Sequence, residues 1–229
     1  MSARFILPLI VIASTLLPSV RSLAADDEKD FVSLFDGKTL DGWQIIGKAG
    51  PGYVVEDGTI VCPADGGGKL FTKKEYANFV FRFEYRLEPG GNNGVGLRAP
   101  LEGDAAYVGM ESQILDDDAP EYAGKLEAGQ YHGSIYKVLP AKQGAPKKAG
   151  EWNTEEIVCD GRHITVTVNG QVTVDGNLDE VTDPDVLKAH PGIQRQRGYV
   201  GFLGHGPVAV YFRNIRIKEL PDSAASGTK

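Results

Sequence analysis

The 229-residue chain has a formal net charge of −7 at neutral pH, and 41% of its residues are hydrophobic. This acidic balance argues against nucleic acid or an anionic membrane surface as a partner, because both attract basic proteins. Beyond residues 1–24, no apolar run approaches the roughly 20 residues of a membrane-spanning helix, so we expect no membrane insertion. The remainder is long enough to bury a sizeable core in one all-β domain.

The N-terminus has the pattern of an export signal. Arg4 precedes an apolar stretch, which is followed by small residues, with Ala24 or Ala25 as the last residue removed. We therefore predict a signal peptide over residues 1–24 and a periplasmic or extracellular protein after its removal. A single domain is expected over residues 25–220. Residues 221–229 are short and polar, and we predict a disordered tail there.

Alternating apolar and polar residues predict β-strands along most of the chain. Residues 53–62 contain two short apolar runs around Glu56-Asp57-Gly58, which is typical of a hairpin. Residues 79–87, FVFRFEYRL, put aromatic side chains on one face of a strand and charged side chains on the other. This strand is expected to turn its aromatic face toward the core.

The second half of the chain continues the β pattern. Residues 163–176 predict a hairpin, because two alternating runs flank Asn169-Gly170, a pair that favours a type I′ turn. Residues 199–220 predict two closing strands, and the one helix candidate is short, with Pro184 in its first turn. These elements predict an antiparallel, jelly-roll-like β-sandwich of two sheets, with one sheet face free to bind a ligand.

Strand parity predicts which polar side chains share that free face. In residues 92–100, valine and leucine are expected to point inward, which turns Arg98 outward. The same reasoning puts Glu111 and Gln113 opposite the core, and Arg86 lies on the polar face of its own strand. A cation, a carboxylate and an amide around an open patch suit a polar, neutral ligand such as a sugar. We therefore predict that these four residues converge.

The acidic end of the next strand has two interpretations. A β-bulge would bring Asp116 to the face of Glu111, and Asp116 is kept as a candidate substrate contact on that basis. Asp117 and Asp118 are interpreted as solvated turn formers. A structural interpretation also applies to Arg98, which could form a cross-strand ion pair with Glu111.

Two histidines lie beside glycines in predicted loops, where catalytic groups concentrate. His132 occurs in GQYHGSIY and His205 in GHG, and glycine lets a backbone approach a ligand closely. Both are candidate proton carriers, with an ordinary loop histidine as the alternative. A divalent metal bound by Glu111, His132 or Asp116 is compatible with the sequence, although no spacing requires one.

The sequence contains two cysteines, Cys62 and Cys159. An oxidising compartment would allow them to form one disulfide. Both lie in apolar strand patterns, however, where a buried free thiol also packs well. The sequence leaves these alternatives open, because it does not give the distance between the two residues.

Several segments, in this order, are similar to one known family. They are FVSLFDGKTLDGW, NNGVGLR, ESQILDD, GSIY, GEWN, VNG and the terminal GHG with VYFRNIRIKEL. Together they resemble the secreted bacterial 3-keto-disaccharide hydrolase family, formerly a domain of unknown function, over essentially the whole of residues 31–220. The resemblance implies a concanavalin A-like sandwich fold and cleavage of 3-keto-glycosides.

The resemblance also implies a chemistry. A ketone at C3 acidifies the proton at C2, so the oxygen at C1 can leave by β-elimination, after which water adds back. Such a site needs a base, an acid and donors for the developing enolate. Glu111 and His132 would be base and acid, in an order left open, and His205 would be a second proton carrier. Arg98 and Gln113 would suit the enolate and the sugar hydroxyls.

Two other functions remain as alternatives. The spacing of Glu111, Gln113 and Asp116 resembles the Glu-x-Asp-x-x-Glu of sandwich-fold glycosidases in family sixteen, which use two carboxylates. The second alternative is a non-catalytic sugar-binding module, although Trp43 and Trp152 do not form an obvious aromatic platform in the sequence. In all three cases the partner is an oligosaccharide or a glycoside.

Overall fold

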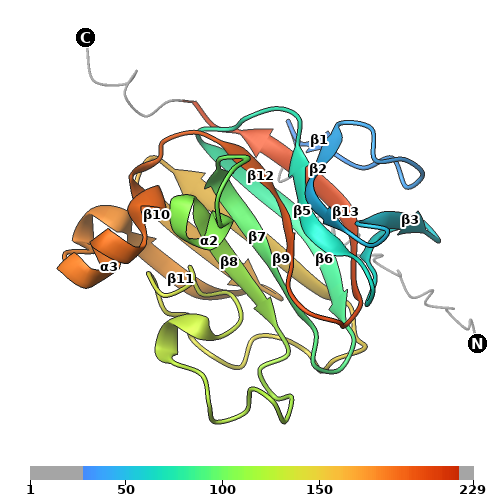
Figure 1. Ribbon diagram of the computed structural model, residues 1–229. Coiled ribbons are helices and arrows are strands. Elements are labelled where there is room, and N and C mark those ends of the chain that lie inside the picture. The colour runs from blue at the N-terminus through green and yellow to red at the C-terminus, as the bar shows by residue number, and fades with distance from the viewer. Residues whose placement is uncertain (1–27, 222–229) are drawn as a thin grey trace, which may run out of the picture. The chain divides into compact units, whose positions relative to one another are not determined.

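Residues 28–221 are described by the computed structural model in Figure 1. The predicted signal peptide lies outside these residues, as does the predicted tail apart from Pro221. No helix in the described part of the chain is long and apolar enough to cross a membrane.

Two antiparallel sheets make up the structure from Phe31 onward. The larger sheet has the order β11 (Gln171–Asn177), β10 (His163–Val168), β9 (Asn153–Asp160), β6 (Phe79–Leu87), β13 (Val210–Glu219), β4 (Thr59–Cys62) and β3 (Val54–Glu56), with β1 (Val32–Ser33) beside β13. The smaller sheet has the order β2 (Trp43–Ala49), β5 (Gly67–Thr72), β12 (Tyr199–Gly204), β7 (Asn92–Ala99) and β8 (Met110–Leu115). The predicted two-sheet antiparallel sandwich is confirmed.

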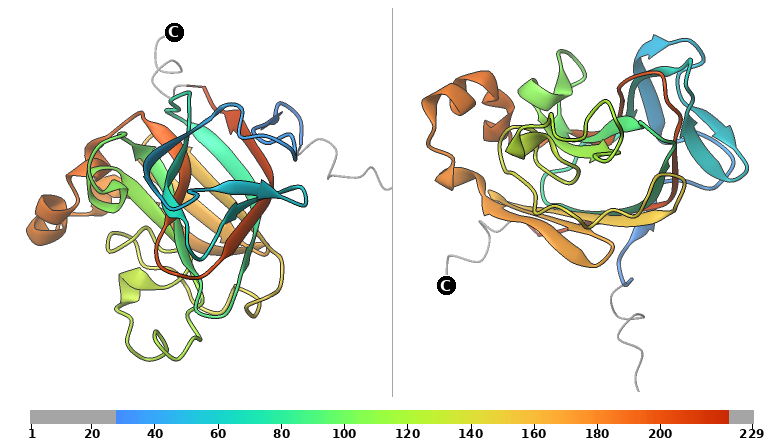
Figure 2. Two further views of the ribbon diagram at one scale, coloured as in Figure 1. Left: turned by 45° about the vertical axis from the view of Figure 1, so that its right-hand side comes forward. Right: turned by 90° about the horizontal axis from the view of Figure 1, so that it is seen from below.

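The core lies between the two layers, which the right-hand view of Figure 2 shows from below. Strand β6 alternates between buried and partly exposed residues along its whole length, as the aromatic pattern predicted. Its Phe83 meets Phe202 of β12 edge to face, with ring centroids 5.6 Å apart, and Phe202 stacks on Phe212 of β13. Aromatic side chains therefore hold the sheets together, because each buries a large apolar area.

The turns and the short helix follow the local sequence. Asn169 and Gly170 both have positive φ, as a type I′ turn between β10 and β11 requires. Helix α3 (Pro184–Ala189) begins after Asp183, whose side chain accepts hydrogen bonds from the first-turn amides. The other helical segments are α2 (Ala105–Val108), η1 (Ala128–Gln130), η2 (Leu178–Glu180) and η3 (Pro191–Gln194).

The two cysteines are free and buried. Cys62 lies in β4 and Cys159 in β9, and two strands, β6 and β13, separate them in the same sheet. Neighbouring strands are about 4.8 Å apart, which puts the two residues about 14 Å apart or more. A disulfide needs Cα atoms within about 7 Å, so the structure favours buried thiols over the disulfide.

Candidate functional site

A polar pocket lies on the outer face of the smaller sheet, at the edge formed by β7 and β8. Its volume is about 290 Å³. Met110, Ser112 and Ile114 of β8 turn inward, so the alternate residues of the strand face this pocket. The full lining, called the Glu111 pocket below, is Asn92, Asp104, Ala106, Tyr107, Glu111, Gln113, Leu115, Tyr122, Leu126, Gln130, Tyr136 and His205.

A carboxylate and an imidazole meet in the Glu111 pocket. His205 Nε2 lies 2.8 Å from Glu111 Oε1, and the two residues are 94 positions apart in the chain. The Glu111 side chain is 3% exposed and that of His205 is 39% exposed. Burial by itself lowers the pKa of His205, but the hydrogen bond to Glu111 and the charges of Glu111 and Asp104 outweigh it, so the pKa is raised.

Glu111 reaches this position because the neighbouring strand carries a glycine. Gly94 of β7 pairs with Gln113, and a Cβ atom at Gly94 would lie 1.8 Å from Glu111 Oε1. The φ angle of Gly94 is outside the left-handed region, so the need for glycine at this position is one of space. A side chain at position 94 would occupy the volume that the carboxylate fills.

Further hydroxyl, amide and carboxyl groups surround the Glu111–His205 pair. Gln113 Nε2 donates to Asn92 Oδ1 at 3.3 Å. Asp104 caps α2 by accepting from the Ala106 amide, and it also lines the pocket. The Tyr107 ring stacks on the His190 ring, with ring centroids 4.8 Å apart. Such groups suit a ligand with many hydroxyls.

Sequence reasoning missed much of this lining. Asp104, Tyr107, Tyr122, Gln130 and Tyr136 come from loops and from the short helix α2. Strand parity gives no information about these segments, and their side chains reach the pocket only because the chain folds over β8. Glu111 and Gln113 lie on the face that parity predicted.

His132 does not lie in the Glu111 pocket. His132 is 2% exposed, and its Nδ1 accepts a hydrogen bond from the Leu115 amide nitrogen at 3.0 Å. The ring nitrogen Nε2 therefore carries the proton of the neutral ring, and it lies 2.9 Å from Tyr85 Oη and 3.3 Å from Glu155 Oε2. Both partners come from the interior faces of the larger sheet, so the prediction that His132 acts beside Glu111 is wrong.

Arg98 is also buried rather than on the free face. Its guanidinium donates to Ala77 O at 2.7 Å, to Gly161 O at 2.8 Å and to Asn78 Oδ1 at 3.2 Å. Parity fails here because Arg98 has a positive φ of 48° and the pairing of β7 with β12 shifts register nearby. The predictions of a sugar contact and of an ion pair with Glu111 are both wrong.

The two other predicted substrate contacts lie elsewhere. Arg86 is in the larger sheet, where its guanidinium lies 4.1 Å from the Tyr211 ring and 5.5 Å from the Trp152 ring. Strand parity correctly predicted that Arg86 lies on the polar face of its strand. It did not predict that this strand belongs to the larger sheet, away from Glu111. Asp116 accepts the Gly90 amide at 2.8 Å and lines other cavities, so it does not join Glu111.

The candidate metal ligands do not converge either. Glu111, His132 and Asp116 lie in three separate environments. Among residues 28–221, no group of three or more His, Cys, Asp or Glu side chains is placed to share a metal ion.

Comparison with solved structures defines the class of fold. The carbohydrate-binding module CBM66 of Bacillus subtilis superposes with a TM-score of 0.53 at 10% identity, over 78% of this chain and 96% of that module. At this identity the likeness concerns the fold alone, and it confirms the lectin-like, concanavalin-type sandwich.

The family follows from the sequence match. Residues 30–218 match the 3-keto-alpha-glucoside-1,2-lyase-like domain, and the chain belongs to this family. The 3-keto-disaccharide hydrolase of Bacteroides thetaiotaomicron is 27% identical, over 85% of this chain and 80% of that protein. A structure from Parabacteroides distasonis, described as a candidate glycosyl hydrolase, has 29% identity and a TM-score of 0.72, over 83% of this chain and 99% of that chain.

Proposed function

We propose that this protein cleaves the glycosidic bond of a 3-keto-disaccharide or related 3-keto-glycoside, by β-elimination followed by hydration. Membership of the family and the name of the Bacteroides relative support a glycosyl-hydrolase-like activity. The observation that carries the proposal is the Glu111–His205 pair at 2.8 Å in a pocket of hydroxyl and amide groups.

In the first step, the Glu111 carboxylate removes the proton from C2 of the keto-sugar. The electron pair of that bond moves onto the C3 ketone as an enolate, and its return expels the glycosidic oxygen from C1. His205 donates a proton to this leaving oxygen, which gives the free second sugar and a 2-hydroxy enone. Water then adds its oxygen to C1 and its proton to C2. The net reaction is hydrolysis.

The properties of the pair suit these roles. The Glu111 side chain is 3% exposed, so few water molecules compete with a bound sugar for its carboxylate. The raised pKa of His205 keeps the imidazole protonated to higher pH, as a general acid requires. Gln113 and the tyrosine hydroxyls of the pocket can donate hydrogen bonds to the enolate oxygen. These groups take the role that the sequence had suggested for Arg98.

Export belongs to the same proposal. Residues 1–24 have the charged, apolar and small-residue regions of a signal peptide. We infer that the protein meets its substrate outside the cytoplasm.

The activity test compares oxidised and plain sugar. Purified protein is incubated with 3-keto-trehalose and, separately, with trehalose, each with and without a chelator. We expect release of 3-keto-glucose and glucose from the oxidised sugar alone. The Glu111→Gln variant is expected to lower kcat by about 100- to 10,000-fold, because it removes the base. Glu180→Gln changes an exposed glutamate outside the pocket and serves as the control.

The mechanism is tested in D₂O. Elimination and hydration put deuterium on C2 of the released 3-keto-glucose, at a rate that exceeds exchange in an enzyme-free sample. Direct displacement at C1 leaves C2 unlabelled and would contradict the elimination step. Cleavage of unoxidised trehalose would instead indicate a two-carboxylate glycosidase. Binding without turnover would indicate a sugar-binding module.

A further inference from the structure

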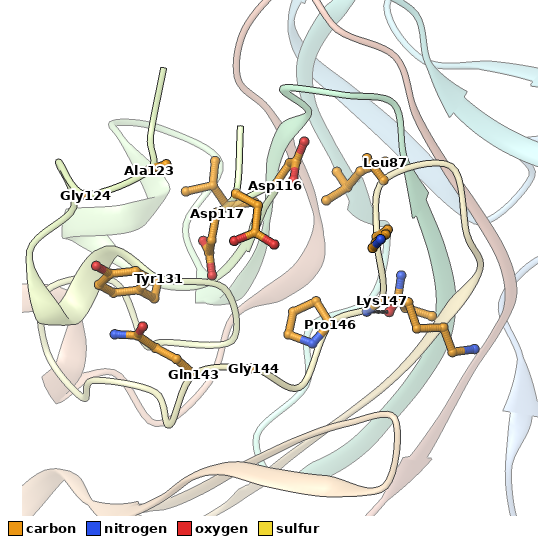
Figure 3. Close-up of a pocket in the computed structure, with 15 residues that line it drawn as sticks. Leu87, Asp116, Asp117, Ala123, Gly124, Tyr131, Gln143, Gly144, Pro146 and Lys147 are labelled. Carbon is orange, nitrogen blue, oxygen red and sulfur yellow. Dashed lines mark hydrogen bonds between the residues drawn. The ribbon is translucent and has the colours of Figure 1, made fainter. Parts of the chain in front are cut away.

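A second cavity lies on the other side of the loop that follows β8. Its volume is about 420 Å³, larger than that of the Glu111 pocket, and Leu115 borders both. Within the loop, Tyr122 lines the Glu111 pocket while Ala123 lines the second cavity, and the same division separates Gln130 from Tyr131. The loop is therefore a wall between two cavities. We call the second one the Asp117 cavity (Figure 3).

Charged groups of both signs line the Asp117 cavity. Asp116 and Asp117 come from the strand end, and Lys147 comes from the loop across from them (Figure 3). Tyr131 and Gln143 add a phenol and an amide. A simple anion would meet the carboxylates and a simple cation would meet the lysine, whereas a neutral ligand with many hydroxyls can donate to one wall and accept from the other.

Apolar groups complete the lining. Leu87, Leu115 and Pro146 border the same cavity as the charged side chains. A sugar ring has C–H faces that pack on such groups while its hydroxyls bond at the edge of the ring. The volume lies in the range of small-molecule sites in proteins.

Asp117 has hydrogen-bonding capacity left for a ligand. Both of its oxygens lie 3.1 Å from one donor, the amide of His132. Burial raises the pKa of Asp117 to about 6, because a single amide compensates the lost hydration poorly. Hydroxyl donors from a ligand would replace part of that hydration.

From this arrangement we infer that the Asp117 cavity is a second carbohydrate-binding site, which holds a neutral sugar ring apart from the Glu111 pocket. The inference goes beyond the proposed function, because the Asp117 cavity lacks the carboxylate–imidazole pair and needs no ketone on the sugar. The site would hold a neighbouring part of a glycan while the Glu111 pocket acts on another.

The test is a titration of the ¹⁵N-labelled protein with trehalose, followed by amide chemical shifts. Sugar is added to about 50 mM, which would populate even a site with a Kd of about 10 mM. We expect saturable shifts at Gln143 and Gly144, on the rim of the Asp117 cavity, and the same shifts in Glu111→Gln. Their persistence in that variant separates this site from the proposed catalytic one.

Two tryptophan variants on the same loop provide the matched comparison. Ala123 is exposed and lines the Asp117 cavity, so Ala123→Trp is expected to fill it and to abolish the shifts at Gln143. Ala128 is exposed but does not line this cavity, and Ala128→Trp is expected to leave them unchanged. Absence of saturable shifts at Gln143 and Gly144 in the parent protein would overturn the inference, as would their persistence in a folded Ala123→Trp protein.

Discussion

At the scale of single residues, Gly94 determines where the Glu111 carboxylate can lie. A Cβ at this position would approach Oε1 to 1.8 Å, so Gly94→Ala must push the carboxylate away from His205. We expect kcat on 3-keto-trehalose to fall by about 10- to 100-fold, because small displacements of a catalytic group have effects of this size.

The control for this prediction is Gly96→Ala, on the same strand and face, where a Cβ would meet Phe71 and Leu203 instead of Glu111. An unchanged kcat in a folded Gly94→Ala protein would contradict a positioning role for Gly94.

Asp117 makes stability depend on pH. Burial raises its pKa from 3.8 to about 6. The interactions with His132 oppose this rise, and the charges of Asp118 and Asp116 add to it by smaller amounts. The folded protein binds the carboxyl proton more tightly than the unfolded chain does. The resulting stabilisation is fully present below the pKa of the unfolded chain, and it is lost as the pH rises through about 6. At pH 8 the ionised group therefore costs folding free energy, about 1–2 kcal/mol after allowance for solvent screening.

Asp117→Asn removes this cost, since an amide oxygen can still accept the His132 proton. We expect the variant to be more stable than the parent at pH 8 in urea unfolding. The advantage should shrink as pH falls toward 4. Asp118→Asn, at the exposed neighbour, is the control. A parent and variant with the same pH profile would show that Asp117 does not carry this effect.

At the scale of elements, Arg98 joins the end of β7 to the turn between β9 and β10. Arg98→Met keeps the buried stem but leaves Ala77 O and Gly161 O without their donor. We expect the free energy of unfolding to fall by about 2–3 kcal/mol, because each partly buried acceptor that loses its donor costs about 1 kcal/mol or more.

Urea denaturation measures this loss, with Arg197→Met at an exposed position as the control. The KM for 3-keto-trehalose should stay unchanged while the Arg98 variant is folded, because the guanidinium does not line the Glu111 pocket. A raised KM with normal stability would restore the role that strand parity had suggested for Arg98.

The elements also show how far local sequence can predict structure. The hairpin at Asn169-Gly170, the amphipathic strand β6 and the capped helix α3 depend on neighbouring residues, and each was predictable. Arg98 was not, because its positive φ and the nearby register shift arise from pairing with β12, about 100 residues later in the chain.

At the scale of the whole molecule, the two sheets separate side chains that the sequence had predicted to form one site. Glu111 faces the outside of the smaller sheet, Arg86 lies on the larger sheet, and His132 lies in the interior. Parity along a strand tells which residues share a face of that strand. It does not tell which of two sheets the strand joins.

The sequence by itself determined the all-β class, the family and the face of β8 that carries Glu111 and Gln113. These depend on local periodicity and on motifs, both of which are written along the chain. Only the tertiary structure decided that His205, rather than His132, meets Glu111, and that residues of helix α2 and its cap, such as Tyr107 and Asp104, complete the pocket. The physical reason is that a pocket is built from side chains far apart in sequence, and their meeting depends on how the strands pair and how the loops fold over them.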